Sequence, residues 1–382
     1  MDNINLNLTD DEKISKVIYA FVCFELIMLF QTSYHSLGLI ATTAVSALIM
    51  LCYVWEFRSI RLDTASIILL MYTVLSILTT LVYRSFDSKF LQYLVYVVLF
   101  VVLSSLKLNG KEKNILLGGF VISGIFYSVL VIYSRTVNAG EYYHSKISLF
   151  GTGLDPNYIG LPLIVAFSIL FFYTLNGNKK IIKTIGLFIL AMAILLTSSR
   201  GNFFSLSVCV VLNVIIFLHN RDISHYKKVF IICGVILAIL LFYLFAESNY
   251  SDFLHRMISF SDEDSDNGRF EIWKQAVEVW LTRPLFGRGF EAQGRLNGVG
   301  AHNTYIQLLC DSGVSGFALF ISFLCFIFFK SFRHNKNLFI AFIGLLVHSF
   351  FLGSIASRCF WAVLIMINLC VNHIDEEQPD YE

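Results

Sequence analysis

The chain has 382 residues, of which 57% are hydrophobic and only 14% charged, and its formal net charge is +1. Soluble domains carry about 25% charged residues, so the composition excludes an ordinary soluble protein and predicts an all-α polytopic membrane protein. The small net charge gives no electrostatic reason to expect nucleic acid as a partner.

Apolar segments of about 20 residues, the length that crosses a bilayer as a helix, recur along the whole sequence. We predict about twelve spans, and only very short breaks separate the seventh from the eighth and the last two from each other. The segments are 14–32, 37–56, 64–83, 90–106, 114–134, 158–175, 182–199, 202–219, 228–246, 313–330, 338–355 and 359–373.

Lysine and arginine gather in every second loop between these segments, which sets the orientation of a multi-span protein. The basic loops follow the second, fourth, sixth, eighth and tenth segments. These loops and both termini are therefore predicted to be cytoplasmic. Residues 1–246 then form spans one to nine, 247–312 form one large periplasmic loop, and 313–382 form spans ten to twelve and a cytoplasmic tail.

The large loop is polar and carries short predicted helices. An acidic run at 261–268 lacks the glycine and glutamate positions of a calcium-binding loop, so we interpret it as a solvated lead into a helix at about 269–282. The apolar stripe of that helix favours either an interfacial helix or a helix docked on the spans, and both readings stay open. A turn with glycines at 284–290, an irregular stretch at 291–300 and a helix at 303–310 follow.

Three arginines and one histidine on the outer side can carry chemistry. Arg200 stands at the outer end of two apolar segments, and Arg269 and Arg288 lie in the large loop. Arg200 either snorkels to the surface or holds a phosphate with its planar, permanently charged fork, to which the other two would add positive charge. His302 precedes a predicted helix and can accept a proton at neutral pH, although a lone histidine is more often structural.

Two further features concern ligands. The residues Asp155-Pro156-Asn157 precede the sixth apolar segment, where they form either a helix-initiating turn or a sugar-binding element. The sequence contains no metal-binding motif, so neither a metal nor another cofactor is expected.

Short motifs in the middle of the chain form an ordered series on the predicted outer side. They are DPN at 155–157, TSSRG at 197–201, GRFEIW at 268–273, RPLFGRG at 283–289, and AHNTY at 301–305 followed by GVSG at 313–316. This series resembles the superfamily of O-antigen polymerases and O-antigen ligases, which assemble bacterial surface polysaccharides. The resemblance implies a membrane glycosyltransferase of the GT-C type in the bacterial inner membrane, with its active site facing the periplasm.

The resemblance also implies roles for individual residues. Arg200 and Arg269, and less closely Arg288, are expected to bind the pyrophosphate of an undecaprenyl-pyrophosphate-linked glycan. His302 is expected to activate the acceptor hydroxyl. The candidate glycan ligands are Asp155, Asn157, Asn303 and Tyr305.

The compact chain, with its segments 155–157 and 302–305, looks more like a polymerase than a ligase. The predicted reaction therefore joins lipid-linked repeat units, without metal and with inversion, and a chain-length regulator is a further expected partner. Two alternatives stay open: a ligase that transfers the glycan to lipid A-core, and a transporter of lipid-linked oligosaccharides.

Overall fold

The computed structural model describes residues 15–29, 35–57, 60, 62–137, 147–149, 152–176, 180–219, 224–226, 228–229, 266–353 and 355–371. The helices before the large loop are α1 Lys16–Leu29, α2 His35–Glu56, α3 Thr64–Val82, α4 Ser88–Leu103, α5 Gly110–Val137, α6 Pro156–Asn176, α7 Lys180–Leu196 and α8 Arg200–His219. The later helices are α11 Asp266–Leu281, α12 Ala292–Asn297, α13 Thr304–His334, α14 Lys336–Ser349 and α15 Arg358–Val371. Most of the ninth predicted span, most of the acidic run at 261–268 and the C-terminal residues 372–382 lie outside the described residues.

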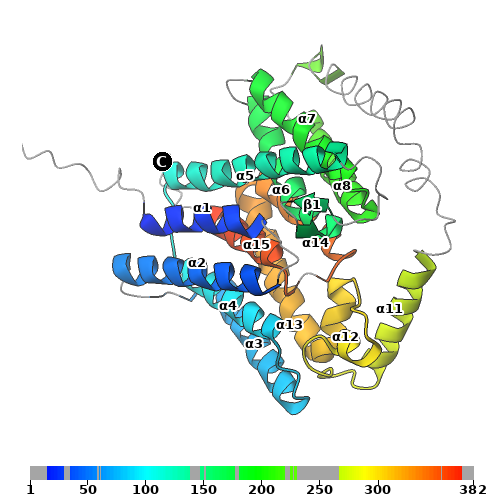
Figure 1. Ribbon diagram of the computed structural model, residues 1–382. Coiled ribbons are helices and arrows are strands. Elements are labelled where there is room, and N and C mark those ends of the chain that lie inside the picture. The colour runs from blue at the N-terminus through cyan, green and yellow to red at the C-terminus, as the bar shows by residue number, and fades with distance from the viewer. Residues whose placement is uncertain are drawn as a thin grey trace, which may run out of the picture.

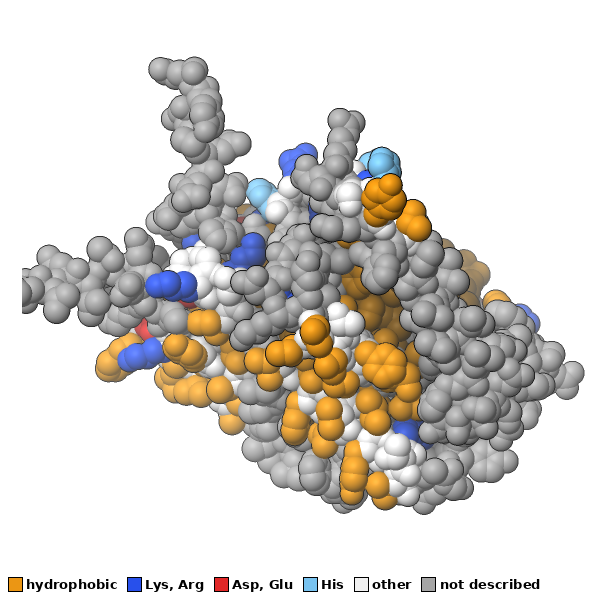
Figure 2. Space-filling view, turned by 90° about the horizontal axis from the view of Figure 1, so that it is seen from above, with side chains coloured by type: hydrophobic (Ala, Val, Ile, Leu, Met, Phe, Trp, Pro, Cys, Tyr) orange, Lys and Arg blue, Asp and Glu red, His pale blue; other side chains and the backbone are white. Residues whose placement is uncertain are grey.

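Every predicted span inside the described ranges coincides with a helix, including the two pairs separated by short breaks. The seventh and eighth are divided by a tight turn in which Ser198 has a φ of 55°. Among the residues that the structure describes, α3, α5, α8 and α13 are long and apolar enough to cross a membrane. Hydrophobic side chains are spread over the face seen in Figure 2, with few charged side chains among them. The structure thus supports a helical membrane protein.

Three details differ from the sequence-based expectation. The stretch at 291–300 contains the short helix α12, which ends at Gly298 with a φ of 77°. Helix α14 ends at Ser349, earlier than the predicted 355, and residues 350–353 continue from it to the site described below. A small antiparallel hairpin, β1 Ile147–Leu149 with β2 Thr152–Leu154, adds to the helices.

Helix α15 lies in the middle of the bundle, packed against α1, α4, α5, α6, α13 and α14 (Figure 1). All of its residues are buried, as expected for a helix that is apolar on every side. Its Trp361 is ringed by Tyr93, Tyr96, Phe100 and Phe323, with ring centroids 5.9–6.5 Å from its own. This aromatic core fixes the helices whose ends build the site.

Polar contacts mark the two ends of the bundle. At one end the start of α1 meets the end of α2 and the start of α5, because the Ser15 amide donates to Glu112 (2.9 Å) and the Lys16 amide to Glu56 (2.8 Å). At the opposite end, here named the site end, the Arg135 Nε at the close of α5 donates to the Leu196 carbonyl at the close of α7 (3.2 Å). Helices α1, α5 and α7 therefore run in one direction, and α2 runs in the opposite direction.

The large loop docks at the site end, against the start of α13. The turn that follows α11 makes backbone hydrogen bonds with α13 on both sides of Gly313: Arg288 and Gly289 donate to Cys310 and Asp311, and Val314 and Ser315 donate to Pro284 and Leu285, at 2.8–3.1 Å. Gly313 has a φ of 63° and interrupts α13, where the sequence predicted the end of the 303–310 helix.

Two facing glycines make this docking possible. A Cβ on Gly287 would lie 2.4 Å from the Asp311 carbonyl carbon, and one on Gly313 would lie 2.4 Å from the Leu285 carbonyl carbon. Both glycines also have positive φ, which an L side chain rarely adopts.

We expect Gly287→Ala and Gly313→Ala each to lower the free energy of unfolding by at least about 1–3 kcal/mol, the typical cost of left-handed strain, and more where the backbones are pushed apart. The check is the thermal unfolding midpoint of the purified protein in detergent. Gly300→Ala is the control, because no atom lies within 4 Å of its Cβ position, and its midpoint should stay near that of the unchanged protein. An equal loss in the control would contradict this account of the docking.

Candidate functional site

The starts of α6 and α8 and the end of α14 meet at the site end. The Asn202 Nδ2 in the first turn of α8 donates to the Pro156 carbonyl of α6 at 3.0 Å. His348 of α14 is buried, and its Nε2 lies 2.9 Å from the Asn157 carbonyl oxygen and 3.0 Å from the Asn202 Oδ1. These contacts bring the sequence motifs at 155–157 and 197–201 together.

The start of α13 joins the same assembly through α14 and the connection after it. The Thr304 hydroxyl donates to the Leu352 carbonyl at 2.7 Å, and the Tyr305 hydroxyl donates to the Leu346 carbonyl at 2.9 Å. The start of α13 therefore lies beside the end of α14, which itself contacts α6 and α8. Three helix amino termini, each with a partial positive charge, are gathered at this end.

A row of aromatic rings connects the first turn of α8 with the first turn of α11. The rings follow the order Phe204, Phe351, Phe350, Trp273 and Phe270, with successive centroids 5.7–6.1 Å apart. Phe351 also contacts Gly201, where an added Cβ would lie 2.7 Å from its Cβ. In the sequence, Arg200 stands four residues before Phe204, and Arg269 stands directly before Phe270. Both arginine side chains are half-buried.

The backbone beside His302 is held from two directions. The Trp273 Nε1 donates to the Ala301 carbonyl at 3.0 Å, and the Ala301 amide donates to the Gln307 Oε1 at 3.4 Å. Gln307 is fixed in turn by its Nε2, which lies 2.9 Å from an Asp311 carboxylate oxygen. His302 itself has a φ of 47° and stays exposed, so the loop presents its imidazole to the outside of the bundle.

Two charged side chains act on this imidazole. Partial desolvation lowers the pKa of His302 below its ordinary value of 6.5, the positive charge of Arg269 lowers that pKa further, and the negative charge of Asp155 raises it. His302, Arg269 and Asp155 come from three motifs far apart in the sequence, yet they lie close enough to influence one another. The imidazole is consequently neutral at neutral pH and can accept a proton.

The four candidate glycan ligands differ in accessibility. Asp155 is exposed, and its Oδ1 accepts from the Asn157 amide (2.9 Å) and the half-buried Asn157 Nδ2 (3.0 Å). Asn303 is only 1% exposed and caps α13, because its Oδ1 accepts from the amides of Tyr305 and Ile306. The Tyr305 hydroxyl is bonded to α14, so Asn303 and Tyr305 hold the start of α13 in place. The glycan-binding role of the four residues stays a prediction.

Arg288 lies beyond the end of α11. Its Nε donates to the Thr282 hydroxyl, which follows the last turn of α11, whereas Arg269 lies in the first turn of that helix. At a helical rise of about 1.5 Å per residue, Arg269 and Thr282 are about 20 Å apart. The sharing of one pyrophosphate site by all three arginines stays a prediction, and α11 lies between Arg269 and the hydrogen-bond partner of Arg288.

Several residues that build the site could not be assigned from the sequence. Trp273 and Gln307 act through contacts whose partners no local pattern indicates. His348, a histidine inside the predicted span 338–355, was detectable as a polar residue in an apolar segment, but its partners were not. Asn202 was detectable in the same way, as a polar residue directly after the TSSRG motif in an apolar span. Among the described residues, no three His, Cys, Asp or Glu side chains are grouped to hold a metal ion.

One comparison with known protein families gives a match. Residues 185–321 match the model of a protein family described as O-antigen ligase, and this stretch contains Arg200, Arg269, Arg288 and His302. The match agrees with the resemblance of the sequence motifs to the O-antigen polymerase and ligase superfamily. No curated protein matches the chain.

Proposed function

We propose that this protein is an O-antigen polymerase, which joins repeat units carried on undecaprenyl pyrophosphate at the periplasmic face of the bacterial inner membrane. The observation that carries the proposal is the grouping of His302 with Arg269 and Asp155, linked by the aromatic row to the helix start that bears Arg200. The family match spans both arginines and the histidine.

The reaction uses these side chains in two roles. Arg200 and Arg269 bind the donor pyrophosphate, and their permanent charge stabilises the negative charge that develops as it leaves. The neutral imidazole of His302 takes the proton of the acceptor hydroxyl while that oxygen bonds to the donor's anomeric carbon. The bond from this carbon to the pyrophosphate oxygen breaks in the same displacement, which inverts the configuration. The leaving group is already activated, so the proposed course requires no metal.

The acceptor separates polymerase from ligase. In a polymerase the attacking hydroxyl belongs to another lipid-linked repeat unit, whereas in a ligase it belongs to lipid A-core. The description of the matching family as O-antigen ligase favours the second candidate. The resemblance of the segments 155–157 and 302–305 to the polymerases favours the first, and we retain it as the proposal.

The test is reconstitution of the purified protein in phospholipid vesicles with undecaprenyl-pyrophosphate-linked repeat units. Products are separated by size, with and without added lipid A-core. A ladder of longer lipid-linked chains without lipid A-core is expected for the polymerase. Transfer that occurs only when lipid A-core is present would establish the ligase instead, and the absence of any transfer would overturn the proposed reaction.

The pH dependence of the reaction reports on His302. As a general base it works only when neutral, so kcat/KM should be high above its pKa in the free enzyme and fall as the pH drops through that value. Because desolvation and Arg269 lower this pKa, the acidic limb should lie below pH 6.5.

Two variants test the directions in which Asp155 and Arg269 shift the pKa of His302. Asp155→Asn removes the charge that raises the pKa of His302, so the acidic limb should move to lower pH. Arg269→Gln removes a charge that lowers it, so the limb of the residual activity should move to higher pH. If the acidic limb stays at the same pH in both variants, His302 is not the group whose protonation causes it.

A further inference from the structure

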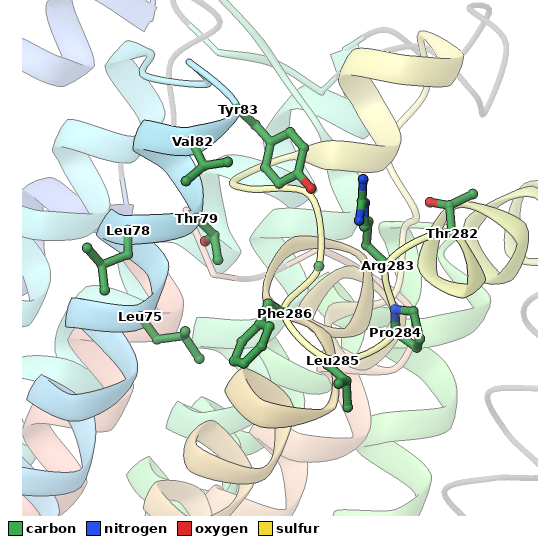
Figure 3. A pocket seen from close by; sticks show the side chains of 11 residues that line it. Leu75, Leu78, Thr79, Val82, Tyr83, Thr282, Arg283, Pro284, Leu285 and Phe286 are labelled. Carbon is green, nitrogen blue, oxygen red and sulfur yellow. The ribbon is translucent and has the colours of Figure 1, made fainter.

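A second feature of the site end is a pocket of about 560 Å³ between the end of α3 and the turn that follows α11. Leu75, Leu78 and Val82 line it from α3, and Leu285 and Phe286 line it from the turn (Figure 3). We call this pocket the α3 groove. Its walls are open to the outside, since Leu78 is 55%, Val82 74% and Phe286 57% exposed.

The rim of the α3 groove is cationic and polar. Figure 3 shows the Tyr83 hydroxyl pointing toward Arg283, which rises from the turn. Arg283 is exposed, and its guanidinium forms no hydrogen bond or ion pair with any residue in the described part of the chain. Arg288 lies on the same turn, bonded to Thr282. An apolar groove with an arginine at its mouth complements a lipid with a hydrocarbon tail and a phosphate-bearing headgroup.

Contacts with α3 and α4 hold the turn that forms one wall of the groove. The turn is tied to α3 and α4 because the Phe290 amide donates to the Thr80 hydroxyl at 3.4 Å and because Lys89 and Glu291 form an ion pair at 2.7 Å. A Cβ on Gly289 would lie 3.1 Å from the Thr79 carbonyl oxygen. The two walls of the groove therefore stay close together.

The separation of the groove from His302 decides which lipid it takes. Thr282 lines the groove and lies about 20 Å from Arg269 along α11. The donor's diphosphate is bonded directly to the reacting anomeric carbon, so the donor's headgroup must lie at Arg269 and His302. An acceptor instead reacts through a sugar at the far end of its glycan, and its lipid headgroup must lie some distance away.

We infer that the α3 groove binds the acceptor, a glycan linked to a polyisoprenyl diphosphate. The tail lies on Leu75, Leu78, Leu285 and Phe286, the diphosphate contacts Arg283, and the glycan extends along α11 to His302. This inference rests on the proposed function for its choice of lipid, and it adds a second lipid site to the enzyme.

The groove is tested with two variants and two controls of the full chain in vesicles. Leu78→Trp fills the groove, and Leu81→Trp is its control, because Leu81 has the same exposure (54%) but does not line the groove. Arg283→Gln removes the charge at the rim. Arg333→Gln, at the exposed end of α13 away from the site end, is the control for that change.

Binding is measured with undecaprenyl diphosphate that carries a photoactivatable group in its tail. Crosslinks to residues 75–83 or 282–287 are expected in the unchanged protein and in both controls, and they should be lost in Leu78→Trp and weakened in Arg283→Gln. Absence of these crosslinks in the unchanged protein would overturn the inference even if chain growth occurs. Crosslinks without chain growth would leave the lipid site standing and refute the proposed function.

The acceptor role is measured with two modified lipid-linked repeat units prepared from cells that lack this protein. One has its hydroxyls methylated and only donates, and the other has a phosphonate in place of the glycosyl phosphate ester and only accepts. Loss of a charge-assisted contact should raise the KM for the acceptor by about tenfold, with the KM for the donor unchanged. A rise in the donor's KM alone would assign the groove to the donor and overturn the inference.

Discussion

Replacing His302 by alanine should reduce glycan chain growth by about 10²–10⁴-fold, the usual contribution of a general base. Desolvation and the charge of Arg269 lower the pKa of the His302 imidazole. Hydrogen bonds to Trp273 and Gln307 hold the backbone of the neighbouring Ala301. The measurement is the rate of ladder formation in vesicles, with membrane insertion and thermal unfolding followed in parallel.

His334→Ala is the matched control for this change. His334 is an exposed histidine in the last turn of α13, at the opposite end of that helix from His302. Its loss should leave chain growth unchanged. A His302→Ala protein that is stably inserted and still produces a near-normal ladder would remove His302 from the proposed mechanism.

Replacing either Arg200 or Arg269 by alanine should reduce the rate by about 10²–10³-fold, since each removes a donor that stabilises the departing oxyanion. Lysine at either position should restore only part of the activity, because an ammonium keeps the charge but loses the bidentate fork. Arg288→Ala should have a much smaller effect on the rate at saturating substrate, since α11 separates Arg288 from Arg269.

The double variant tests whether both arginines serve one diphosphate. Groups that act on the same atoms are strongly non-additive, so Arg200→Ala combined with Arg269→Ala should lose little more activity than the more damaging single change. Arg333→Ala is the control for charge. If the losses in activation free energy of the two single variants add up fully in the double variant, the two arginines act independently, which would contradict the shared site.

Arg269 has a double effect in this scheme. Before the substrate binds, its charge helps to keep the His302 imidazole neutral. When the donor's diphosphate binds Arg269, the negative charge of the ligand offsets that influence and makes the imidazole a stronger proton acceptor. Donor binding and activation of the acceptor are thereby coupled through one side chain.

The sequence by itself determined the class of the protein. Hydropathy and charge are local properties, and a span is recognised from its own residues, so the helices of the described region coincide with the predicted segments. The motifs at 197–201, 268–273 and 301–305 likewise carry their chemistry in their residue types. The match over residues 185–321 agrees with the superfamily those motifs indicate.

The tertiary structure decided which of these residues meet. Arg269, Asp155 and His302 come together because the starts of α6, α11 and α13 lie at one end of the bundle. Asn303 became a cap and Tyr305 a brace for α14, and the length of α11 separates Arg288 from Arg269. Such outcomes depend on packing between segments far apart in the chain, and the local pattern of residues contains no information about the distance between two helix ends.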